Sequence, residues 1–277
     1  MSALHNIART FVDRRARREA LADYPGDIPA DMAHAYAIQD LAISLREEPV
    51  VGWKIGRLSP ENQARFGTER LCGPVFASRL KRAEDADETL SIDVIPGGFA
   101  AVEAEYVFEL GLDIQPGQVP ETPIDVLRAL SAVYAGVEMA GSPLLTINDL
   151  GPTVVASDYG NNNGLILGPR LVDLTSARLE DLDVEALSTF RAETFIDGEA
   201  VGRGGLFTMP GGPLAALAWL FKHLDSRGYP LKKGMLVSSG ATTGIHDVRS
   251  GQMALVRFMG PMTQEHELVI RTVDAPQ

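Results

Sequence analysis

The sequence predicts an α+β protein, in which a helical N-terminal segment precedes a core rich in β-strands. Apolar residues recur at helical spacing within the first 48 residues. After Pro49, short apolar runs separated by Gly and Pro follow one another, which is typical of strands. The chain has 277 residues and no repeat, low-complexity tract or linker. We therefore expect a helical segment, 1–80, packed on one compact core unit, 81–277.

The individual elements follow from spacing and from turn residues. The expected helices are one around residues 4–12, then Met32–Leu45 after a turn at Tyr24–Asp27, and two inside the β-rich part, Thr122–Tyr134 and Pro213–Leu224. The expected strands lie at Val50–Ile55, Val75–Ala77, Ala101–Leu110, Ala132–Met139, Val154–Ala156, Leu165–Leu167, Ser188–Ile196, Met235–Ser239, Met253–Phe258 and Leu268–Thr272. The glycines between Gly202 and Gly212 match no nucleotide-binding motif and are expected in turns.

Composition and charge exclude several classes of function. The 25 basic and 37 acidic residues give a net charge of −12, which disfavours a nucleic-acid partner. The run Arg14, Arg15, Arg17 and Arg18 is therefore expected on a solvated helix face. Cys72 is the single cysteine, so an intrachain disulfide is excluded, and it is expected to be a small core residue. Neither a signal peptide nor an apolar stretch of about 20 residues is found, which predicts a cytoplasmic protein without a membrane partner.

Three glutamates lie in apolar runs. Glu103 and Glu105 are two residues apart in a predicted strand and so point to the same face, and Glu138 lies in a second apolar run. A carboxylate in a buried strand is costly unless it is paired or bound to a cation. Three carboxylates without a His or Cys partner would suit Mg²⁺ or Mn²⁺. The alternative is a solvated acidic face.

A lysine and two polar loops are further candidates. Lys54 lies in an apolar strand between Gly52 and Gly56, where burial would lower its pKa and suit proton transfer or binding of a substrate carboxylate. A lysine whose amine reaches solvent from the strand end is the alternative. The polar, glycine-containing loops 158–164 and 238–244 could bind a ligand or be plain turns. His246 is expected to be a solvent-facing loop histidine.

Seven short motifs, taken in order, carry a resemblance to a known family: Ala35–Gln39, Gly52–Gly56, Val102–Glu105, Gly136–Glu138, Asp158–Gly168, Leu217–Leu220 and Ser239–Gly244. Over roughly residues 30–260 the chain resembles the 2-keto-4-pentenoate hydratase and 4-oxalocrotonate decarboxylase group of the fumarylacetoacetate hydrolase superfamily. The resemblance implies a mixed β-roll core with flanking helices, a catalytic unit over 81–277 and a homo-oligomer.

The resemblance also implies the site and its chemistry. Glu103, Glu105 and Glu138 match the family's three metal-binding positions for Mg²⁺ or Mn²⁺, and Lys54 matches its active-site lysine. The expected partner is a small-molecule 2-oxo acid, with Lys54 and Glu105 as catalytic residues. The expected substrate-binding residues are Lys54, Asp158, Asn161, Ser239, Gly240 and Thr243.

The expected function is a metal-dependent hydratase that adds water to a 2-hydroxy-dienoate or 2-oxo-enoate through a metal-chelated enolate, in the catabolism of aromatic compounds. The same metal platform would support a 2-oxo-enedioate decarboxylase or an acylpyruvate hydrolase. The alternative from another class is a non-catalytic relative with an altered active site.

The sequence departs from the family pattern in two places. Hydratases of the group tend to carry an active-site Asp after the lysine strand, where this chain has Leu71, so Glu69 or Arg70 is the candidate substitute. Where the family usually offers small serines, the chain has the run Asn161–Asn163, and Ala241 replaces another frequent serine. These departures leave hydration, decarboxylation and C–C hydrolysis open.

Overall fold

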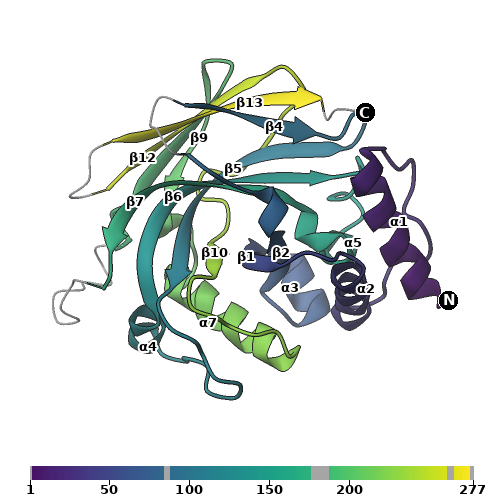
Figure 1. Ribbon diagram of the computed structural model, residues 1–277, viewed down its shortest axis with the longest axis horizontal. Helices are drawn as coiled ribbons and strands as arrows, with labels where there is room; N and C mark the ends of the chain where they lie inside the picture. The colour runs from purple at the N-terminus through teal and green to yellow at the C-terminus, as the bar shows by residue number, and fades with distance from the viewer. Residues whose placement is uncertain (1, 84–87, 176–186, 261–264, 275–277) are drawn as a thin grey trace.

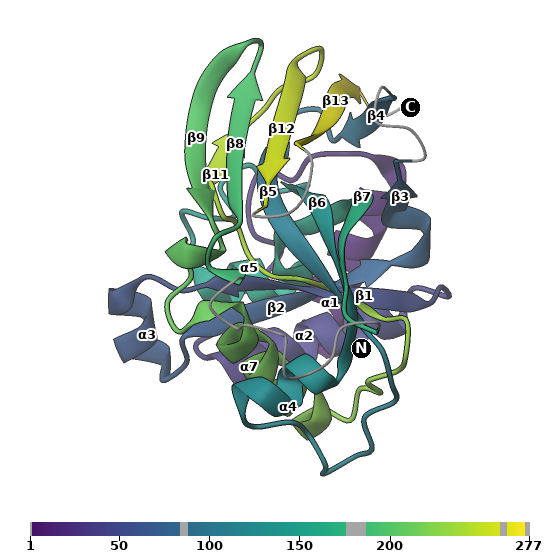
Figure 2. The same ribbon diagram turned by 90° about the vertical axis from the view of Figure 1, so that its left-hand side faces the viewer.

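Two sheets and a group of helices make up the fold in the computed structural model, which describes residues 2–83, 88–175, 187–260 and 265–274. A large curled sheet runs through the middle of the molecule, and a smaller sheet lies above it (Figure 1). The helices lie on the opposite side of the large sheet from the smaller sheet, as the turned view makes plain (Figure 2). This arrangement is the α+β class that the sequence predicts.

The described elements have the following bounds. The helices are α1 (Ala3–Arg17), α2 (Met32–Ser44), α3 (Pro60–Phe66), α4 (Pro123–Arg128), α5 (Pro152–Ser157) and α7 (Gly212–Ser226), with short 3-10 turns at Ala77–Arg79, Tyr159–Asn161 and Leu206–Thr208. The strands are β1 (Val50–Arg57), β2 (Arg70–Phe76), β3 (Leu80–Arg82), β4 (Thr89–Val94), β5 (Phe99–Leu110), β6 (Leu130–Ser142), β7 (Asn162–Asp173), β8 (Arg191–Ile196), β9 (Glu199–Gly205), β10 (Leu236–Ser238), β11 (Ile245–Asp247), β12 (Met253–Met259) and β13 (His266–Asp274).

The strand order of the large sheet places distant parts of the chain next to one another. Among the described residues it has eight strands in the order β2-β1-β10-β5-β6-β7-β3, with β11 paired to β5. The smaller sheet has the order β4-β13-β12-β8-β9. Tyr106 of β5 packs edge-on against Phe190 and against Phe258 of β12, which joins the two sheets in a shared core. Four neighbouring strands, β1, β10, β5 and β6, therefore lie side by side although they come from distant parts of the chain.

One arginine of the first helix, Arg15, does not lie on a solvated helix face as the sequence predicts. Ile7, Ala8, Phe11 and Arg15 fall on one face of α1, and all four are buried. Arg15 is therefore not part of a solvated arginine face, because its position repeats the apolar spacing at i+4 and i+8. Its guanidinium reaches the carboxylate of Asp158, with Nε 2.6 Å from Oδ1, so α1 is tied to the sheet region by a buried ion pair.

Two predicted elements were wrong. Residues 154–156 are not a strand but the middle of α5, which begins with Pro152 and buries all six of its residues. A short apolar run does not distinguish a buried strand from a buried helical turn. The helix predicted over Thr122–Tyr134 ends at Arg128, because the chain from Leu130 onward pairs with β5. Pairing between strands overrides local helical spacing there.

Several described elements had no counterpart in the prediction, namely helix α3 and strands β3, β4, β9 and β11. Helix α3 begins after Ser59, whose hydroxyl accepts a hydrogen bond from the Asn62 amide, and carries a proline in its first turn. Strand β9 occupies part of the glycine-rich stretch expected to form turns. Strands β1 and β2 belong to the large sheet, and the division of the chain at residue 80 stays a prediction.

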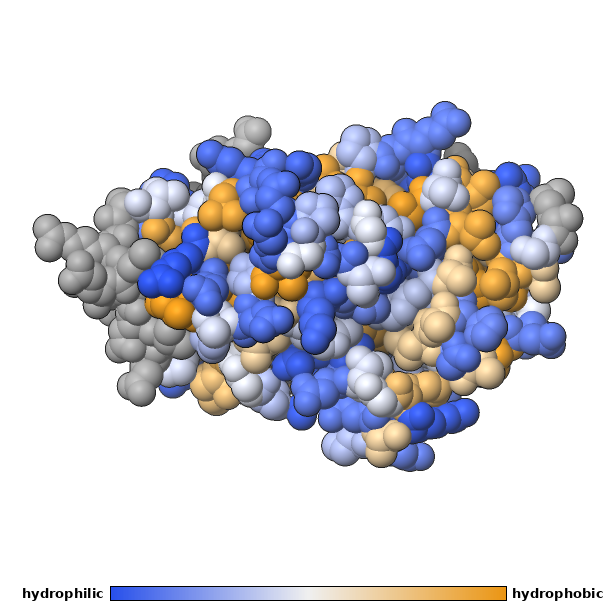
Figure 3. Space-filling model, turned by 90° about the horizontal axis from the view of Figure 1, so that it is seen from below, coloured by the Kyte–Doolittle hydropathy of each residue, from blue (hydrophilic) through white to orange (hydrophobic). Residues whose placement is uncertain are grey.

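The outer surface is of mixed polarity. Seen from below, hydrophilic and hydrophobic residues alternate over the described face (Figure 3). Among the described residues, no helix has the length and apolar character needed to cross a membrane.

Candidate active site

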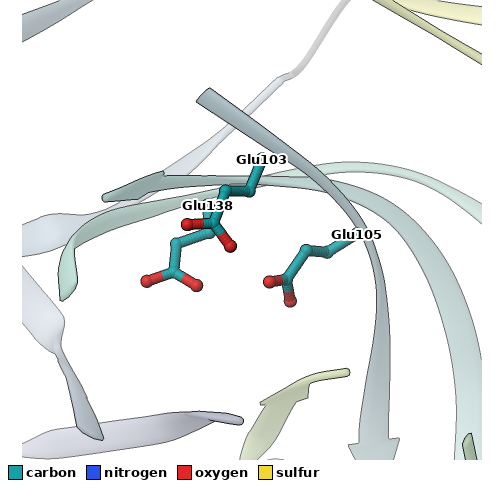
Figure 4. Close-up of side chains that lie close together, drawn as sticks. All are labelled: Glu103, Glu105 and Glu138. Atoms are coloured by element: carbon teal, nitrogen blue, oxygen red, sulfur yellow. The ribbon is translucent and has the colours of Figure 1, made fainter. Parts of the chain in front are cut away.

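Three buried carboxylates meet on the large sheet. Glu103 and Glu105 project from β5, and Glu138 lies on β6 directly opposite Glu103 in the antiparallel register. One oxygen of each carboxylate lies within 4.8 Å of an oxygen of the other two. The three side chains converge on one space (Figure 4). Their exposed fractions are 3%, 0% and 0%, so the alternative of a solvated acidic face is wrong.

Hydrogen bonds hold Glu105 and Glu138 by one oxygen each. Glu105 Oε2 accepts hydrogen bonds from the Ser238 hydroxyl and from the Gly240 amide, the latter at 2.9 Å. Glu138 Oε1 accepts one from the Asn162 side chain at 3.1 Å. Within the described part of the chain, Glu103 Oε1, Glu105 Oε1 and Glu138 Oε2 are buried without a partner.

Burial and mutual repulsion act on these carboxyls. Burial first, and then the charge of Glu138, raises the pKa of Glu103 to about 8. Burial, with Glu138 and Glu103 behind it, holds the pKa of Glu105 well above its usual range. Converging oxygen atoms without partners are the donor set that a hard divalent cation prefers. The residues present therefore fit a Mg²⁺ or Mn²⁺ ion.

Lys54 completes this charge cluster. Strand β1 pairs with β10 in parallel, which sets Lys54 opposite Ser238 and brings its Nζ to 3.3 Å from Glu138 Oε1. The side chain is 4% exposed, so an amine in solvent is excluded. The predicted lowering of the Lys54 pKa is wrong: burial lowers it, but the three carboxylates together, Glu138 most of all, outweigh burial and raise the pKa.

A cavity of about 340 Å³ opens beside the carboxylates, with Lys54 and Glu103 in its wall. This volume suits a small organic molecule. Four of the predicted substrate-binding residues line it: Lys54, Asn161, Ser239 and Gly240. Among the described residues, the Ser239 hydroxyl and the Asn161 Oδ1 are buried without a hydrogen-bond partner, so both are available to a ligand.

Two predicted substrate-binding residues lie outside this wall. The Asp158 carboxylate is fully buried and accepts hydrogen bonds from Arg15 and from the Ser142 hydroxyl. The Thr243 hydroxyl lies 2.8 Å from the hydroxyl of Thr194 on β8. Neither contributes to the cavity lining, and the role of both residues in substrate binding stays a prediction.

Leu71 stands at the position where hydratases of the group tend to carry an active-site aspartate. Leu71 lines the cavity, and a Cβ built on Gly56 would lie 3.2 Å from its Cδ1 and 3.8 Å from Lys54 Nζ. Of the two candidate substitutes, Arg70 lines the cavity, whereas Glu69 is 68% exposed and does not. Sequence reasoning did not select Arg57 and Asn148, which also line it, because neither belongs to a motif.

Of two other candidates, Cys72 is the buried core residue that the sequence predicts, whereas the prediction of a solvent-facing loop histidine at His246 is wrong. Cys72 is fully buried, and burial raises the pKa of its thiol to about 11. His246 lies on β11 rather than in a loop and is half-buried, and its Nε2 lies 3.1 Å from the Thr243 carbonyl. Burial lowers its pKa, and it lies outside the carboxylate cavity.

Comparison with known proteins identifies the family. No protein-family model matches the chain. A 2-keto-4-pentenoate hydratase of Burkholderia vietnamiensis is 31% identical over 245 residues, which cover 87% of this chain and 87% of that protein. The chain belongs to the 2-keto-4-pentenoate hydratase and 4-oxalocrotonate decarboxylase group of the fumarylacetoacetate hydrolase superfamily. A 4-oxalocrotonate decarboxylase of a Pseudomonas species is 27% identical over 251 residues, covering 90% of this chain and 91% of that one.

The group's fold matches as well. The structure of a 4-oxalocrotonate decarboxylase from Pseudomonas putida G7, complexed with magnesium and adipate, superimposes with a TM-score of 0.76 at 22% identity, covering 98% of this chain and 97% of that chain. This likeness confirms the predicted fold class. Because the named relatives include both hydratases and a decarboxylase, membership of the group leaves the reaction to be decided by the site.

Proposed function

We propose that this chain is a divalent-metal-dependent hydratase that acts on a 2-oxo-enoate or its 2-hydroxy-dienoate tautomer in the catabolism of aromatic compounds. The observation that carries the proposal is the set of three buried carboxylates, each with an oxygen lacking a partner, beside Lys54 and a cavity. A divalent ion held by Glu103, Glu105 and Glu138 would supply Lewis-acid stabilisation of negative charge on the substrate's 2-oxo oxygen.

The chain's own residues would orient and protonate the substrate. Among the described residues, Lys54 Nζ is the one ammonium that reaches both the carboxylates and the cavity, so it would hold the substrate carboxylate or move a proton to and from the substrate. The Ser239 hydroxyl and the Asn161 side chain would hydrogen-bond substrate oxygens from the cavity wall. Glu105, fixed by Ser238 and Gly240, would keep its free oxygen aimed at the cation.

The proposed hydration consists of proton transfers and the addition of water, and it needs no oxidant or reductant. A proton added to C5 of the 2-hydroxy-2,4-dienoate, with loss of the proton from its 2-hydroxyl group, converts it to the 2-oxo-3-enoate tautomer. Water next forms a bond from its oxygen to C4, one of its protons is lost and a proton is added to C3. The product is a 4-hydroxy-2-oxo acid. Stabilisation of the negative charge that develops on the 2-oxo oxygen lowers the barrier of the addition step.

Replacement of Glu105 by Gln tests the proposal. It keeps the shape of the side chain and the strand, and removes one metal-binding charge. We expect metal-dependent hydration to fall by at least about a hundredfold, since one group that stabilises transition-state charge is worth about 3–4 kcal/mol. Glu109→Gln on the same strand, away from the cavity lining, is the matched control. Turnover by E105Q at the wild-type rate would contradict the proposal.

Metal binding and product analysis complete the test. Mn²⁺ titration followed by electron paramagnetic resonance should give one site per chain, and oxalate, a mimic of the enolised 2-oxo acid, should perturb its spectrum. E105Q should lose that site while E109Q keeps it. Product analysis separates the related reactions: CO₂ release would indicate a decarboxylase, and pyruvate release an acylpyruvate hydrolase. Absence of any specific Mn²⁺ site would favour the non-catalytic alternative.

A further inference from the structure

Arg15 of α1 is a buried charged residue that the proposed chemistry does not use. Helix α1 lies at the outer edge of the helical group (Figure 1), and the Arg15 side chain is 4% exposed. Its guanidinium makes two contacts with the Asp158 carboxylate, Nε to Oδ1 at 2.6 Å and Nη2 to Oδ2 at 2.9 Å. This paired geometry is specific to a planar guanidinium. Asp158 therefore neutralises the charge of Arg15 inside the protein.

Other N–H groups of Arg15 bind two backbone carbonyls. Nη1 donates to the Asn162 carbonyl at 3.0 Å, and Nη2 donates to the Gly141 carbonyl at 2.8 Å. Gly141 lies on β6, three residues beyond Glu138, and Asn162 is the first residue of the neighbouring strand β7. One guanidinium therefore holds the two strands together close to a carboxylate of the candidate metal site.

The pairing of these two strands is irregular at this place. Glu138 lies opposite Leu165 and Ala140 lies opposite Asn162, so β7 has one residue more than β6 between the two pairs. A bulge of this kind interrupts the ladder and changes the direction of nearby side chains. Because Arg15 binds the carbonyl of Asn162, it fixes the backbone of β7 on one side of the bulge.

The side chain of Asn162 connects the bulge to the carboxylate cluster. Its Nδ2 donates to Glu138 Oε1 at 3.1 Å, and Lys54 Nζ lies 3.3 Å from the same oxygen. Within the described residues, Glu138 Oε2 is buried without a partner. The Asn162 amide therefore helps to determine which oxygen of Glu138 is free for a cation.

We propose that Arg15 is a positioning residue of the metal site, which acts through Asn162 on Glu138. Docking of α1 on the sheet then raises the affinity for a divalent cation, and a bound cation stabilises the docked helix. Thermodynamic linkage makes these two effects equal in size. The inference rests on the proposed function, because it takes Glu138 as a metal ligand.

Replacement of Arg15 by Lys tests the inference. Lysine keeps a positive charge beside Asp158 but lacks the planar fork that also reaches the two carbonyls. We expect Arg15→Lys to weaken Mn²⁺ binding, followed by electron paramagnetic resonance, by at least about tenfold, since loss of a group that orients a metal ligand typically costs 10–100-fold in affinity. Arg17→Met, which removes an exposed arginine from the same helix, is the matched control and should leave the Kd unchanged.

Thermal unfolding of the same variants separates positioning from general support of the fold. If R15K had a lower Tm and the wild-type Kd for Mn²⁺, Arg15 would only tie α1 to the sheet, and the inference would be overturned.

A double-mutant cycle on the Kd for Mn²⁺ tests the route through Asn162. Asn162→Ala removes the amide that binds Glu138 and keeps the backbone carbonyl that Arg15 binds. The single variant should also weaken Mn²⁺ binding. Adding R15K to N162A should change the Kd by no more than about twofold, because both residues act on one contact. Fully additive effects would contradict the proposed route.

Hydrogen exchange of the wild-type protein tests the reciprocal effect without any change to Arg15. Saturating Mg²⁺ should slow exchange of the α1 amides over residues 7–15 by about tenfold relative to a chelating buffer, the same factor as in the Kd. Helix α4, which makes none of these contacts, is the reference, and slowing in α1 should exceed slowing in α4. Equal exchange of α1 with and without bound Mg²⁺ would overturn the inference.

The outcomes distinguish this inference from the proposed function. A wild-type protein without a specific Mn²⁺ site would overturn both. A wild-type protein that binds Mn²⁺ at one site, together with R15K and N162A variants that bind it equally well, would overturn the inference and leave the proposed function standing.

Discussion

At the scale of single residues, the protein stores electrostatic free energy in its site. Glu103, Glu105 and Glu138 are buried together, and the one cation in ion-pair contact with them among the described residues is Lys54. Burial and repulsion among the carboxyls raise the pKa of Glu103 to about 8 and hold that of Glu105 well above its usual range, so negative charge on the metal-free cluster is unfavourable. Burial of charge without full compensation costs several kcal/mol. The cluster therefore serves a function at the expense of stability.

Glu103→Gln is expected to stabilise the metal-free protein. The variant removes one buried acid from the cluster and keeps the shape of the side chain, so its free energy of unfolding should rise by about 1–3 kcal/mol. For a chain of this size that corresponds to an increase in Tm of about 2–5 °C. Differential scanning calorimetry in a chelating buffer measures it, with the exposed Glu121→Gln as control.

Added Mg²⁺ should reverse the order of the two proteins. A cation that binds only the folded state raises Tm according to its concentration relative to Kd. The wild-type protein, with all three carboxylates, should gain more from Mg²⁺ than E103Q. Equal Mg²⁺-induced shifts in both proteins would show that Glu103 is not a ligand.

At the scale of elements, the contact between β1 and β10 positions the lysine. Gly52 lies opposite Leu236, and a Cβ built on Gly52 would lie 2.4 Å from the Leu236 carbonyl oxygen. A glycine is therefore needed for the two strands to approach, and two residues later this pairing sets Lys54 opposite Ser238. The site thus depends on a residue outside the cavity lining.

Gly52→Ala should damage stability and the site together. The methyl group would collide with backbone rather than with a flexible side chain, and overpacking of this kind costs about 1–3 kcal/mol. We expect a lower midpoint in urea and, in the folded fraction, weaker binding of oxalate in the presence of Mn²⁺ because Lys54 is displaced. A wild-type midpoint and wild-type oxalate binding would contradict the role given to Gly52.

At the scale of the whole molecule, the packing of helix α7 against helix α2 makes stability depend on pH. His223 on α7 stacks on Trp219 and contacts the Tyr36 ring of α2. Burial, and then the nearby Arg227 charge, lowers the pKa of His223 to about 4. The neutral imidazole is therefore the form that the packed helices accept.

Acidification is expected to destabilise the protein through this histidine. The unfolded chain binds a proton at His223 with a pKa of about 6.5, whereas the folded protein resists it down to about 4, so the free energy of unfolding falls as the pH decreases through this window. His223→Phe keeps an aromatic stack and should show a shallower dependence between pH 6.5 and 4. An identical slope in both proteins, measured by urea unfolding, would contradict this role.

Much of the fold and part of the candidate site could be predicted from the sequence alone. Alternation along β5 places Glu103 and Glu105 on one face, and this follows from the strand period of two. The motif order around Lys54 and Glu138 led to the family and the fold class. Helical spacing located α1, α2 and α7 within a few residues, because each has a continuous apolar face.

Only the tertiary structure decided what depends on contacts between distant segments. Burial of the carboxylates, the raised pKa of Lys54, and the pairing of Asp158 with Arg15 follow from groups more than 15 residues away along the chain. The same holds for α5, whose apolar run has no length or period that distinguishes it from a strand. Register between β1 and β2 set Arg57 opposite Arg70, and local sequence does not encode register between strands.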